Sequence, residues 1–383
     1  MTSTIIDPLA AGEAAAAEPG TGEPGVSATV SGSLAAALRR SAEIERRIGR
    51  EPHSFRILTG DRPTGALHLG HYFGTLANRV RLQDAGAQLF ILIADYQVLT
   101  DRDVASQLAE HVTGLVADYL AIGIDPVKST VFAHSAVPAL NQLMLPFLSL
   151  ISVSELQRNP TVKEELKASS QIAMSGLMLT YPVHQAADIL FCKANLVPVG
   201  KDQLPHLEIA RAIARRFNER YAEGSAFFPV PDALLSAAPN LLGTDGQKMS
   251  KSRANSITLA ATADETALLV RRAKTDALRH ISYEPQARPE VSSLVLLAAL
   301  CQGRDPAAVA AEIGSGGSAV LKQVVTESVN EFLRPIRARR AELMADPGYL
   351  THVISAGNAV AGTIATRTLT EVQSMMGTCY GMP

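Results

Sequence analysis

The chain contains 383 residues, of which 47% are hydrophobic and 19% are charged. This composition excludes a wholly disordered chain, and at about 150 residues per domain the length predicts two or three folded units. The net charge of −2 excludes nucleic-acid binding through an overall positive charge. Binding through a local basic patch is not excluded. The longest uninterrupted apolar run, 89–94, is far shorter than the roughly 20 residues of a membrane helix, so we expect no membrane span.

The three cysteines, Cys192, Cys301 and Cys379, are widely spaced and odd in number. They indicate neither a disulfide framework nor a zinc cluster, and they suit a reducing cytoplasm. Residues 1–50 are expected to be a flexible N-terminal extension, because the start of the chain is rich in Ala, Gly, Ser, Thr and Pro. Within it, 34–50 can form a charged helix with a solvated face.

Apolar runs and helical periods alternate between residues 55 and 221. Strands are predicted at 55–60, 89–95, 130–135 and 196–200, and helices from 67 and at 104–122, 144–155, 161–169, 182–194 and 202–221. This alternation predicts a parallel sheet covered on both faces. Ligands of such sheets bind beyond the carboxyl ends of the strands, where Gly60, Asp95 and Gly200 are expected.

After residue 260 no strand pattern follows. Helices are predicted at 263–274, 292–301, 320–344 and 350–376. The expected fold is therefore α/β, with a Rossmann-like parallel-sheet nucleotide-binding domain over 51–255 and an all-helical C-terminal domain over 256–383.

A turn at 63–65 leads into a helix that begins with His68-Leu69-Gly70-His71. His68 and His71, three residues apart, lie on one helical face. A helix N-terminus attracts phosphate, the histidines can donate hydrogen bonds, and Gly70 lets a flat ring approach the backbone. Taken alone, such a pair is more often a capping or surface feature than a site, and no third metal ligand is close in sequence.

A second polar segment, GTDGQKMSKS, covers 243–252. Its two lysines, Lys248 and Lys251, with Ser250 and Ser252, can surround a polyphosphate and neutralise the charge of a departing leaving group. A lysine-bearing loop by itself is usually only solvated. Here it follows the histidine pair by about 180 residues.

The two segments together resemble the HIGH and KMSKS signatures of class I aminoacyl-tRNA synthetases. YPVHQAADILF (181–191) and VPVGKDQLPHLEIAR (197–211) resemble segments of the tryptophanyl-tRNA synthetases. The resemblance runs from about residue 55 to 378. It implies a tryptophan–tRNA ligase that uses ATP and Mg²⁺, acts on tRNA(Trp), forms a homodimer in the cytoplasm and carries no resident metal site.

Asp188 is the expected determinant of the amino acid. Indole offers one N–H donor and no acceptor, so a buried carboxylate recognises it and is left unpaired by a ring that lacks the donor. Asp188 shares a helical face with Gln185 and Tyr181, and its apolar neighbours argue against a solvated acid.

The resemblance also implies roles for individual residues. On the amino-acid side, Thr59 and Gly60 would lie against the indole, Gln185 would line the pocket, and Tyr181 and Gln203 would hold the α-amino group. The ATP site would comprise Arg62, Thr64, His68, Gly70, His71, Asp202 near the ribose, Met249 against adenine, Ser250, and Lys248 and Lys251 on the pyrophosphate, joined more loosely by Lys163.

Several positions depart from the family pattern. HLGH stands where many bacterial members have TIGN, and Arg62, Gln185 and Lys201 replace Gln, Met and Glu. These changes are typical of a divergent, second-copy bacterial type. The chain also contains no tryptophan. We hypothesise that it can therefore be translated when charged tRNA is scarce, as suits an inducible or resistance copy.

Two alternatives stay open: a tyrosine-specific ligase, and a tryptophan-activating or tryptophan-binding paralogue with a non-translational role. The basic stretch RPIRARRAE, with Arg334, Arg337, Arg339 and Arg340, is either a solvated face or a contact for the RNA backbone.

Overall fold

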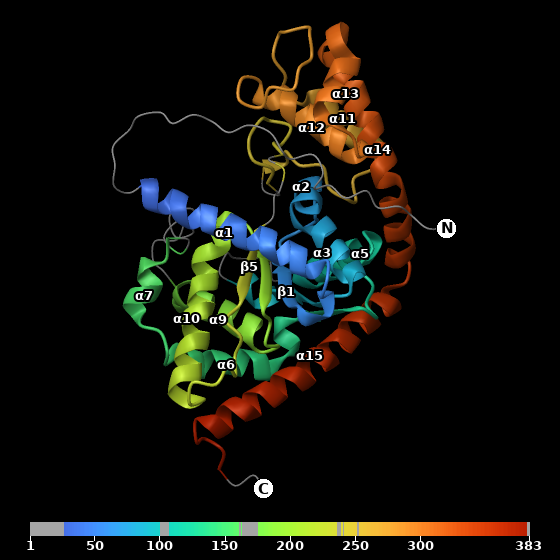
Figure 1. Ribbon diagram of the computed structural model, residues 1–383. Coiled ribbons are helices and arrows are strands. Elements are labelled where there is room, and N and C mark those ends of the chain that lie inside the picture. Colours follow the sequence, from blue (N-terminus) through green and yellow to red (C-terminus); the bar gives the residue numbers. More distant parts are fainter. Residues whose placement is uncertain are drawn as a thin grey trace. The chain divides into compact units, whose positions relative to one another are not determined.

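A computed structural model describes residues 27–99, 107–160, 162, 175–235, 239, 241–250 and 253–380, without the side chains of 27–35 and Asp202. The described chain forms two compact units, each built from segments that are separate in sequence (Figure 1). The helical unit contains Gly65–Ala77 and Ala237–Ala345. The sheet unit contains Ala28–Thr64, Asn78–Ser236 and Asp346–Pro383.

Five parallel strands form the centre of the sheet unit, in the order β3-β2-β1-β4-β5. Their bounds are Arg56–Asp61 (β1), Gln88–Ile93 (β2), Ser129–Ala133 (β3), Leu196–Val199 (β4) and Asp232–Leu235 (β5). The predicted parallel sheet is confirmed, and four of the strands coincide with predicted ones. The exception is β5, whose four residues follow a proline-rich turn and are too few to give a pattern.

The described helices of the sheet unit precede, connect and follow these strands. They are α1 (Ser27–Ile48), α3 (Ala77–Ala85), α4 (Asp95–Val98), α5 (Leu108–Ala121), α6 (Pro138–Leu148), α7 (Val153–Arg158), α9 (Gly176–Leu190), α10 (Leu204–Tyr221) and α15 (Pro347–Met375), with short 3-10 turns at Pro52–Ser54 (η2), His134–Ala136 (η4) and Lys201–Gln203 (η5).

Two of the helices predicted between 144 and 194 differ clearly in their bounds. The helix predicted from 182 begins at Gly176, because the side chain of Ser175 accepts a hydrogen bond from the Met178 amide and caps it, so Pro182 lies inside the helix. The helix predicted over 144–155 is divided between α6 and α7 at 149–152, where Ser152 begins a capping box with Glu155. Of the helix predicted at 161–169, only residue 162 is among the described residues.

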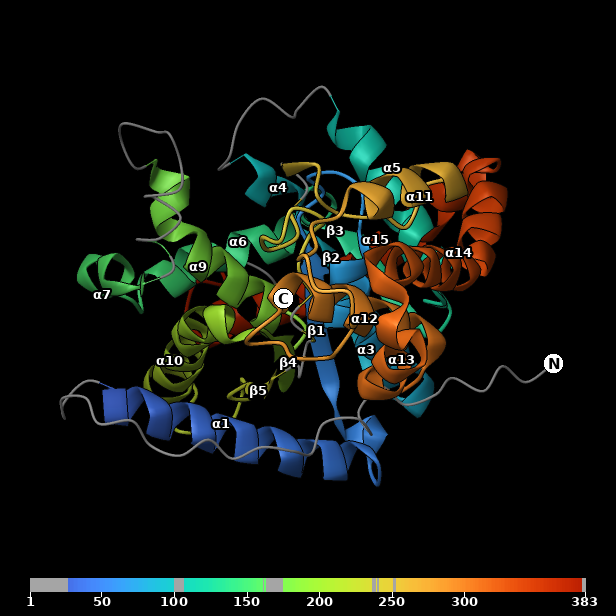
Figure 2. The ribbon, with the colours of Figure 1, turned by 90° about the horizontal axis from the view of Figure 1, so that it is seen from above.

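Both edges of the sheet are covered by helices from the ends of the chain. At the β5 edge, α1 runs alongside the sheet (Figure 2). The Ser41 side chain of α1 accepts a hydrogen bond from the Leu235 amide at 3.0 Å. At the β3 edge, the Asn358 side chain of α15 accepts one from the Ala133 amide at 3.0 Å. Each helix therefore satisfies an edge N–H group that would otherwise offer a pairing site to another chain.

Part of the extension expected to be flexible is thus an ordered component of the sheet unit. Ile44 and Ile48 of α1 are buried, and Glu45 pairs with Arg81 at 2.7 Å. The charged face that suggested a solvated helix coexists with this buried stripe, since an amphipathic helix needs only one apolar side to pack.

Aromatic and aliphatic side chains fill one face of the sheet. Leu58, Phe90 and Phe132 from the strands belong to one buried cluster with Phe191 after α9 and Phe217 of α10. The cluster also includes Ala361, Ala365, Leu369 and Val372 of α15. This apolar stripe explains why the last predicted helix joins the sheet unit instead of the helical region expected over 256–383.

The helical unit combines the histidine-bearing turn with the chain after β5. Its elements are α2 (Leu69–His71), a π-helical turn at Tyr72–Leu76 (η3), α11 (Ala263–Arg272), α12 (Pro289–Gln302), α13 (Pro306–Ile313), a 3-10 turn at Gly314–Gly316 (η7) and α14 (Gly317–Met344). The sequence pattern did not reveal α13, whose start is set by the Asp305 cap and Pro306.

In the described parts of the chain no single helix is long and apolar enough to cross a membrane. One bent pair, Pro289–Gln302 with Pro306–Met344, passes by length and composition alone.

The close approach of α15 to β3 predicts a sharp contrast between two glycines of the same helix. A Cβ atom at Gly357 would overlap the carbonyl oxygen of Val131, whereas a Cβ at Gly362 would meet no atom within 4 Å. We expect Gly357→Ala to lower the free energy of unfolding by about 1–3 kcal/mol, and Gly362→Ala to raise it by about 0.5–1 kcal/mol. Urea denaturation followed by circular dichroism measures both, and equal midpoints for the two variants would contradict the packing.

Candidate active site

The histidine motif and the lysine-bearing loop belong to the same unit, although about 180 residues separate them in sequence. Backbone hydrogen bonds join the histidine segment to the strand-like residues after the loop. The Leu69 amide donates to the Ile257 carbonyl at 3.0 Å, and the Leu259 amide donates to the Leu67 carbonyl at 2.9 Å. The histidine segment therefore lies directly beside the residues that follow the loop.

The two histidine rings contact each other, with centroids 3.6 Å apart. The His68 backbone amide donates to His71 Nδ1 at 3.2 Å. Because Nδ1 accepts this bond, the proton of a neutral His71 imidazole lies on Nε2, which is then a hydrogen-bond donor. A Cβ at Gly70 would lie 3.1 Å from Met249 Sδ, so the glycine allows the methionine of the loop to approach the histidine segment.

Asn255 holds the lysine-bearing loop in place, and sequence reasoning missed it. Its side-chain amide donates to Asp245 at 2.8 Å and to the Lys248 carbonyl at 3.1 Å, and it accepts from the Ser250 amide at 2.9 Å. It is 2% exposed. A lone asparagine after a polar loop looks like any turn residue in sequence, so no local pattern distinguishes it.

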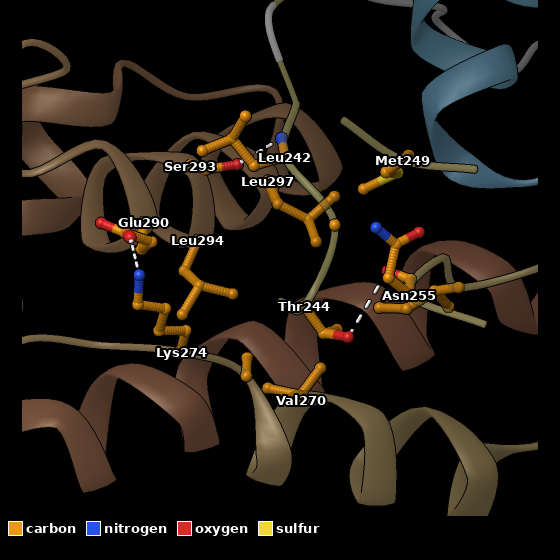
Figure 3. A pocket seen from close by; sticks show the side chains of 13 residues that line it. Leu242, Thr244, Met249, Asn255, Val270, Lys274, Glu290, Ser293, Leu294 and Leu297 are labelled. Carbon is orange, nitrogen blue, oxygen red and sulfur yellow. Dashed lines mark hydrogen bonds and ion pairs between the residues drawn. The ribbon is translucent and has the colours of Figure 1, made fainter. Parts of the chain in front are cut away.

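A small cavity lies behind the loop, between its base and helices α11 and α12 (Figure 3). The Leu242 amide donates to Ser293 at 2.8 Å, and Lys274 pairs with Glu290 at 2.7 Å across its rim. Its volume of about 10 Å³ suits at most about one water molecule, so it is a packing space and not a nucleotide pocket.

Asp188 lies on α9 in the sheet unit and is 1% exposed. Its Oδ1 lies 2.6 Å from Nε2 of His134, which follows β3 and is fully buried. Its Oδ2 has no hydrogen-bond partner among the described residues. The predicted burial of this carboxylate is thus observed, while His134 is a second residue that sequence reasoning missed, because a histidine after a strand has no distinctive pattern.

His184, one helical turn before Asp188, stacks on His134 with ring centroids 4.4 Å apart. The two imidazoles and the carboxylate place ligand atoms within 4.8 Å of one another, as a metal site would require. However, imidazole lone pairs lie in the ring planes, and these planes are inclined by only 30°. Stacked rings direct their lone pairs nearly side by side, so the arrangement fits a hydrogen-bonded network better than a shared metal ion.

The other residues predicted to bind the amino acid also lie in the sheet unit. Tyr181 is 7% exposed, and its hydroxyl lies 3.0 Å from His206 Nε2. Gln185 and Gln203 are half-buried. At Gly60 a Cβ would lie 2.9 Å from Leu92 Cβ and would overlap the Leu92 carbonyl, so the strand pairing itself requires glycine there.

Arg62 and Thr64 are exposed just beyond β1. Beneath them, the Asp61 carboxylate accepts hydrogen bonds from Arg79 at 2.5 Å and from the Tyr119 hydroxyl at 2.6 Å. Burial, followed by the negative charge of Asp61, holds the pKa of Tyr119 well above its usual range, so this hydroxyl stays protonated. The buried network fixes the end of β1 from which the two exposed residues extend.

The remaining predicted residues divide as follows. In the helical unit, Lys248 is exposed, and Met249 and Ser250 are half-buried. Lys251 and Lys163 lie outside the described residues, as does the side chain of Asp202. Among the described residues that were predicted to bind ATP, Arg62 and Thr64 belong to the sheet unit, and those of the two motifs belong to the helical unit.

Comparisons with known proteins identify the family. The family model of the class I tRNA synthetases (W and Y) matches residues 50–334. The chain belongs to this family. This confirms the class I aminoacyl-tRNA synthetase resemblance and the α/β fold with a helical C-terminal region.

Individual relatives are similar over most of their length. The tryptophan–tRNA ligase of Treponema pallidum is 42% identical over 329 residues, which cover 84% of this chain and 96% of the relative. That of Streptococcus pyogenes serotype M1 is 41% identical over 340 residues, covering 85% and 98%. The crystal structure of tryptophanyl-tRNA synthetase from Campylobacter jejuni, complexed with ADP and tryptophan, matches with a TM-score of 0.74 and 29% identity, covering 84% and 99%.

Loss of the Asn255 side chain is expected to make residues 244–250 of the lysine-bearing loop more mobile, because three hydrogen bonds to Asp245, Lys248 and Ser250 disappear together. In Asn255→Ala, backbone amides of 244–250 should exchange hydrogen for deuterium several-fold faster, with α14 unchanged. Gln247→Ala is the matched control, since Gln247 joins the loop network through its backbone. Equal protection of the loop in the two variants, measured by mass spectrometry, would refute the role of Asn255.

Proposed function

We propose that the chain is a tryptophan–tRNA ligase, which activates L-tryptophan with ATP and transfers it to tRNA(Trp). The observation that carries the proposal is the unpartnered Oδ2 of Asp188. A carboxylate oxygen that is buried without a hydrogen bond is costly, and the single N–H of an indole would supply the missing donor. The named ligases of other organisms support the same amino acid over tyrosine.

Residues around Asp188 would hold the rest of the amino acid. Tyr181 and Gln185 stand on the same helical face as Asp188, and Gln203 follows β4. We assign the α-amino group to Tyr181 and Gln203. Thr59 and Gly60 at the end of β1 would contact the indole face. The pairing of β1 with β2 leaves no room for a side chain at Gly60.

Activation needs little covalent chemistry from the protein. The carboxylate oxygen of tryptophan attacks the α-phosphorus of ATP, a bond to that phosphorus forms, and the bond to the pyrophosphate oxygen breaks. The nucleophile is already an anion, so no general base is required. Lys248 and Lys251 would stabilise the departing pyrophosphate, and His68 and His71 would donate to the phosphates, by position and charge. Lys163 is assigned the same role on the weaker sequence match.

Mg²⁺ would accompany ATP, since this ion is usually held by substrate phosphates, water and one or two carboxylates. The loop at 243–250 offers a single carboxylate, Asp245, which already accepts hydrogen bonds from Asn255 and the Gln247 amide. These residues do not form a dedicated magnesium site. When bound, the ion would neutralise phosphate charge.

Transfer to the terminal ribose of tRNA completes the proposed reaction, which we place in the cytoplasm and assign to a homodimer. The basic stretch on α14 offers less to RNA than its sequence suggests. Arg337 donates to Thr266 at 2.8 Å and Asn330 at 2.9 Å, and Arg334 pairs with Glu331 at 2.6 Å. Arg337 is thus a structural residue of the helical unit.

ATP–pyrophosphate exchange tests the activation step. We expect exchange with tryptophan and not with tyrosine. Asp188→Asn should raise KM for tryptophan about 10- to 100-fold with KM for ATP unchanged, because a hydrogen bond to a charged group contributes about 1.5–3 kcal/mol. The control Asp232→Asn removes a carboxylate that pairs with Arg40 on α1. Exchange with tyrosine would overturn the assignment.

Charging of tRNA is a separate measurement. Exchange with tryptophan together with aminoacylation of tRNA(Trp) is the expected result. Exchange without aminoacylation would instead identify a tryptophan-activating paralogue with a non-translational role.

A further inference from the structure

The two oxygens of Asp188 have different surroundings. Oδ1 faces His134 Nε2 at 2.6 Å, and Oδ2 has no partner in the described part of the chain. Because the side chain is 1% exposed, water does not compensate this asymmetry, and a ligand reaches Oδ2 only when the side chains that cover it move aside. The orientation of the carboxylate, and hence which oxygen is left for a ligand, depends on His134.

His134 cannot readily change its own orientation. Its ring stacks on that of His184, with centroids 4.4 Å apart, and is nearly parallel to that of Tyr96, with centroids 6.4 Å apart and planes inclined by 21°. The backbone beside it is fixed as well, because the Ser135 amide and hydroxyl both donate to Asp95, which follows β2. Contacts of the residues that follow β2 and β3 thus hold the imidazole in one orientation.

His184 is excluded as the donor to Asp188. Asn141 donates through Nδ2 to the carbonyls of His134 and Val137 at 2.7 and 3.1 Å, so its Oδ1 is an acceptor. That oxygen lies 2.7 Å from His184 Nε2, which must therefore carry the proton. Burial lowers the pKa of His184, so its ring stays neutral and its proton is committed to Asn141.

We propose that His134 is a positioning residue for substrate specificity. Its Nε2–H holds Oδ1 of Asp188, and so presents Oδ2 to the N–H of the bound indole. The proposal rests on the proposed function, because it takes tryptophan as the ligand. It predicts that His134 contributes to the recognition of one atom of the substrate, the indole nitrogen, rather than to binding in general.

The test compares two ligands that differ at this atom. Tryptophan has the N–H donor, and 3-(benzothiophen-3-yl)alanine is a near-isostere with sulfur in its place. Isothermal titration calorimetry gives Kd for both, with the full-length protein and three variants. His134→Leu removes the hydrogen bond, His134→Gln keeps a side-chain N–H donor, and His184→Leu removes the stacked ring while the His134 contact with Asp188 remains.

In His134→Leu we expect Kd for tryptophan to rise about 10- to 100-fold while Kd for the sulfur isostere changes less than about threefold. His134→Gln should restore most of the preference for tryptophan. His184→Leu should weaken both ligands by similar factors, as a packing change does. In steady-state exchange, His134→Leu should raise KM for tryptophan and leave kcat close to that of the unaltered protein.

Equal losses for the two ligands in His134→Leu would overturn the proposal and assign the residue to packing alone. Failure of His134→Gln to restore the preference, with its thermal midpoint unchanged, would also count against it. The unaltered protein separates these results from the proposed function. Binding of tryptophan without exchange or charging would refute the ligase and leave the role of His134 standing. A lack of tryptophan binding would refute both.

Discussion

The parallel pairing of β1 with β2 on one side and β4 on the other is the constraint on which the rest of the structure depends. Strand order reverses between β1 and β4, which is where open parallel sheets bind their ligands. The same pairing leaves no room for a side chain at Gly60 and fixes the neighbouring strand ends that carry Asp95 and His134. The positions of these residues are thus determined by the pairing of the strands that they end or follow.

Two carboxylates near the sheet, Asp61 and Asp188, differ in how their oxygens are hydrogen-bonded. Asp61 receives two donors at one oxygen, since Arg79 and Tyr119 both bond to Oδ2, and loss of either partner of such a buried pair would destabilise the fold. Asp188 is satisfied through one oxygen only. The donors to Asp61 thus lie within the chain, whereas our proposal assigns the second oxygen of Asp188 to the substrate.

Sequence patterns were sufficient for the features that depend on neighbouring residues. Apolar runs predicted β1 to β4, and the spacing along α9 placed Tyr181, Gln185 and Asp188 on one face. Features that depend on distant contacts were not predictable. Three residues, His134, Ser41 and Asn358, act through hydrogen bonds to residues that are distant in sequence, and nothing in their local sequence marks them. The partners of Asn255 are only 5 to 10 residues away, but in sequence it looks like any other turn residue. The division into units failed to follow the sequence order for the same reason, because the edge that α15 covers lies more than two hundred residues earlier.

The position of α15 has a consequence for biosynthesis. A ribosome makes β1 to β3 first, then β4 and β5, then the long segment Ala237–Ala345 of the other unit, and only afterwards the helix that covers the β3 edge. Until that last helix emerges, the nascent sheet exposes an open strand edge and an apolar face that Leu369 and Val372 will later fill. The sheet unit is therefore completed only after α15 has been made, and a premature stop within α15 would release a chain whose β3 edge stays open to pairing with other chains.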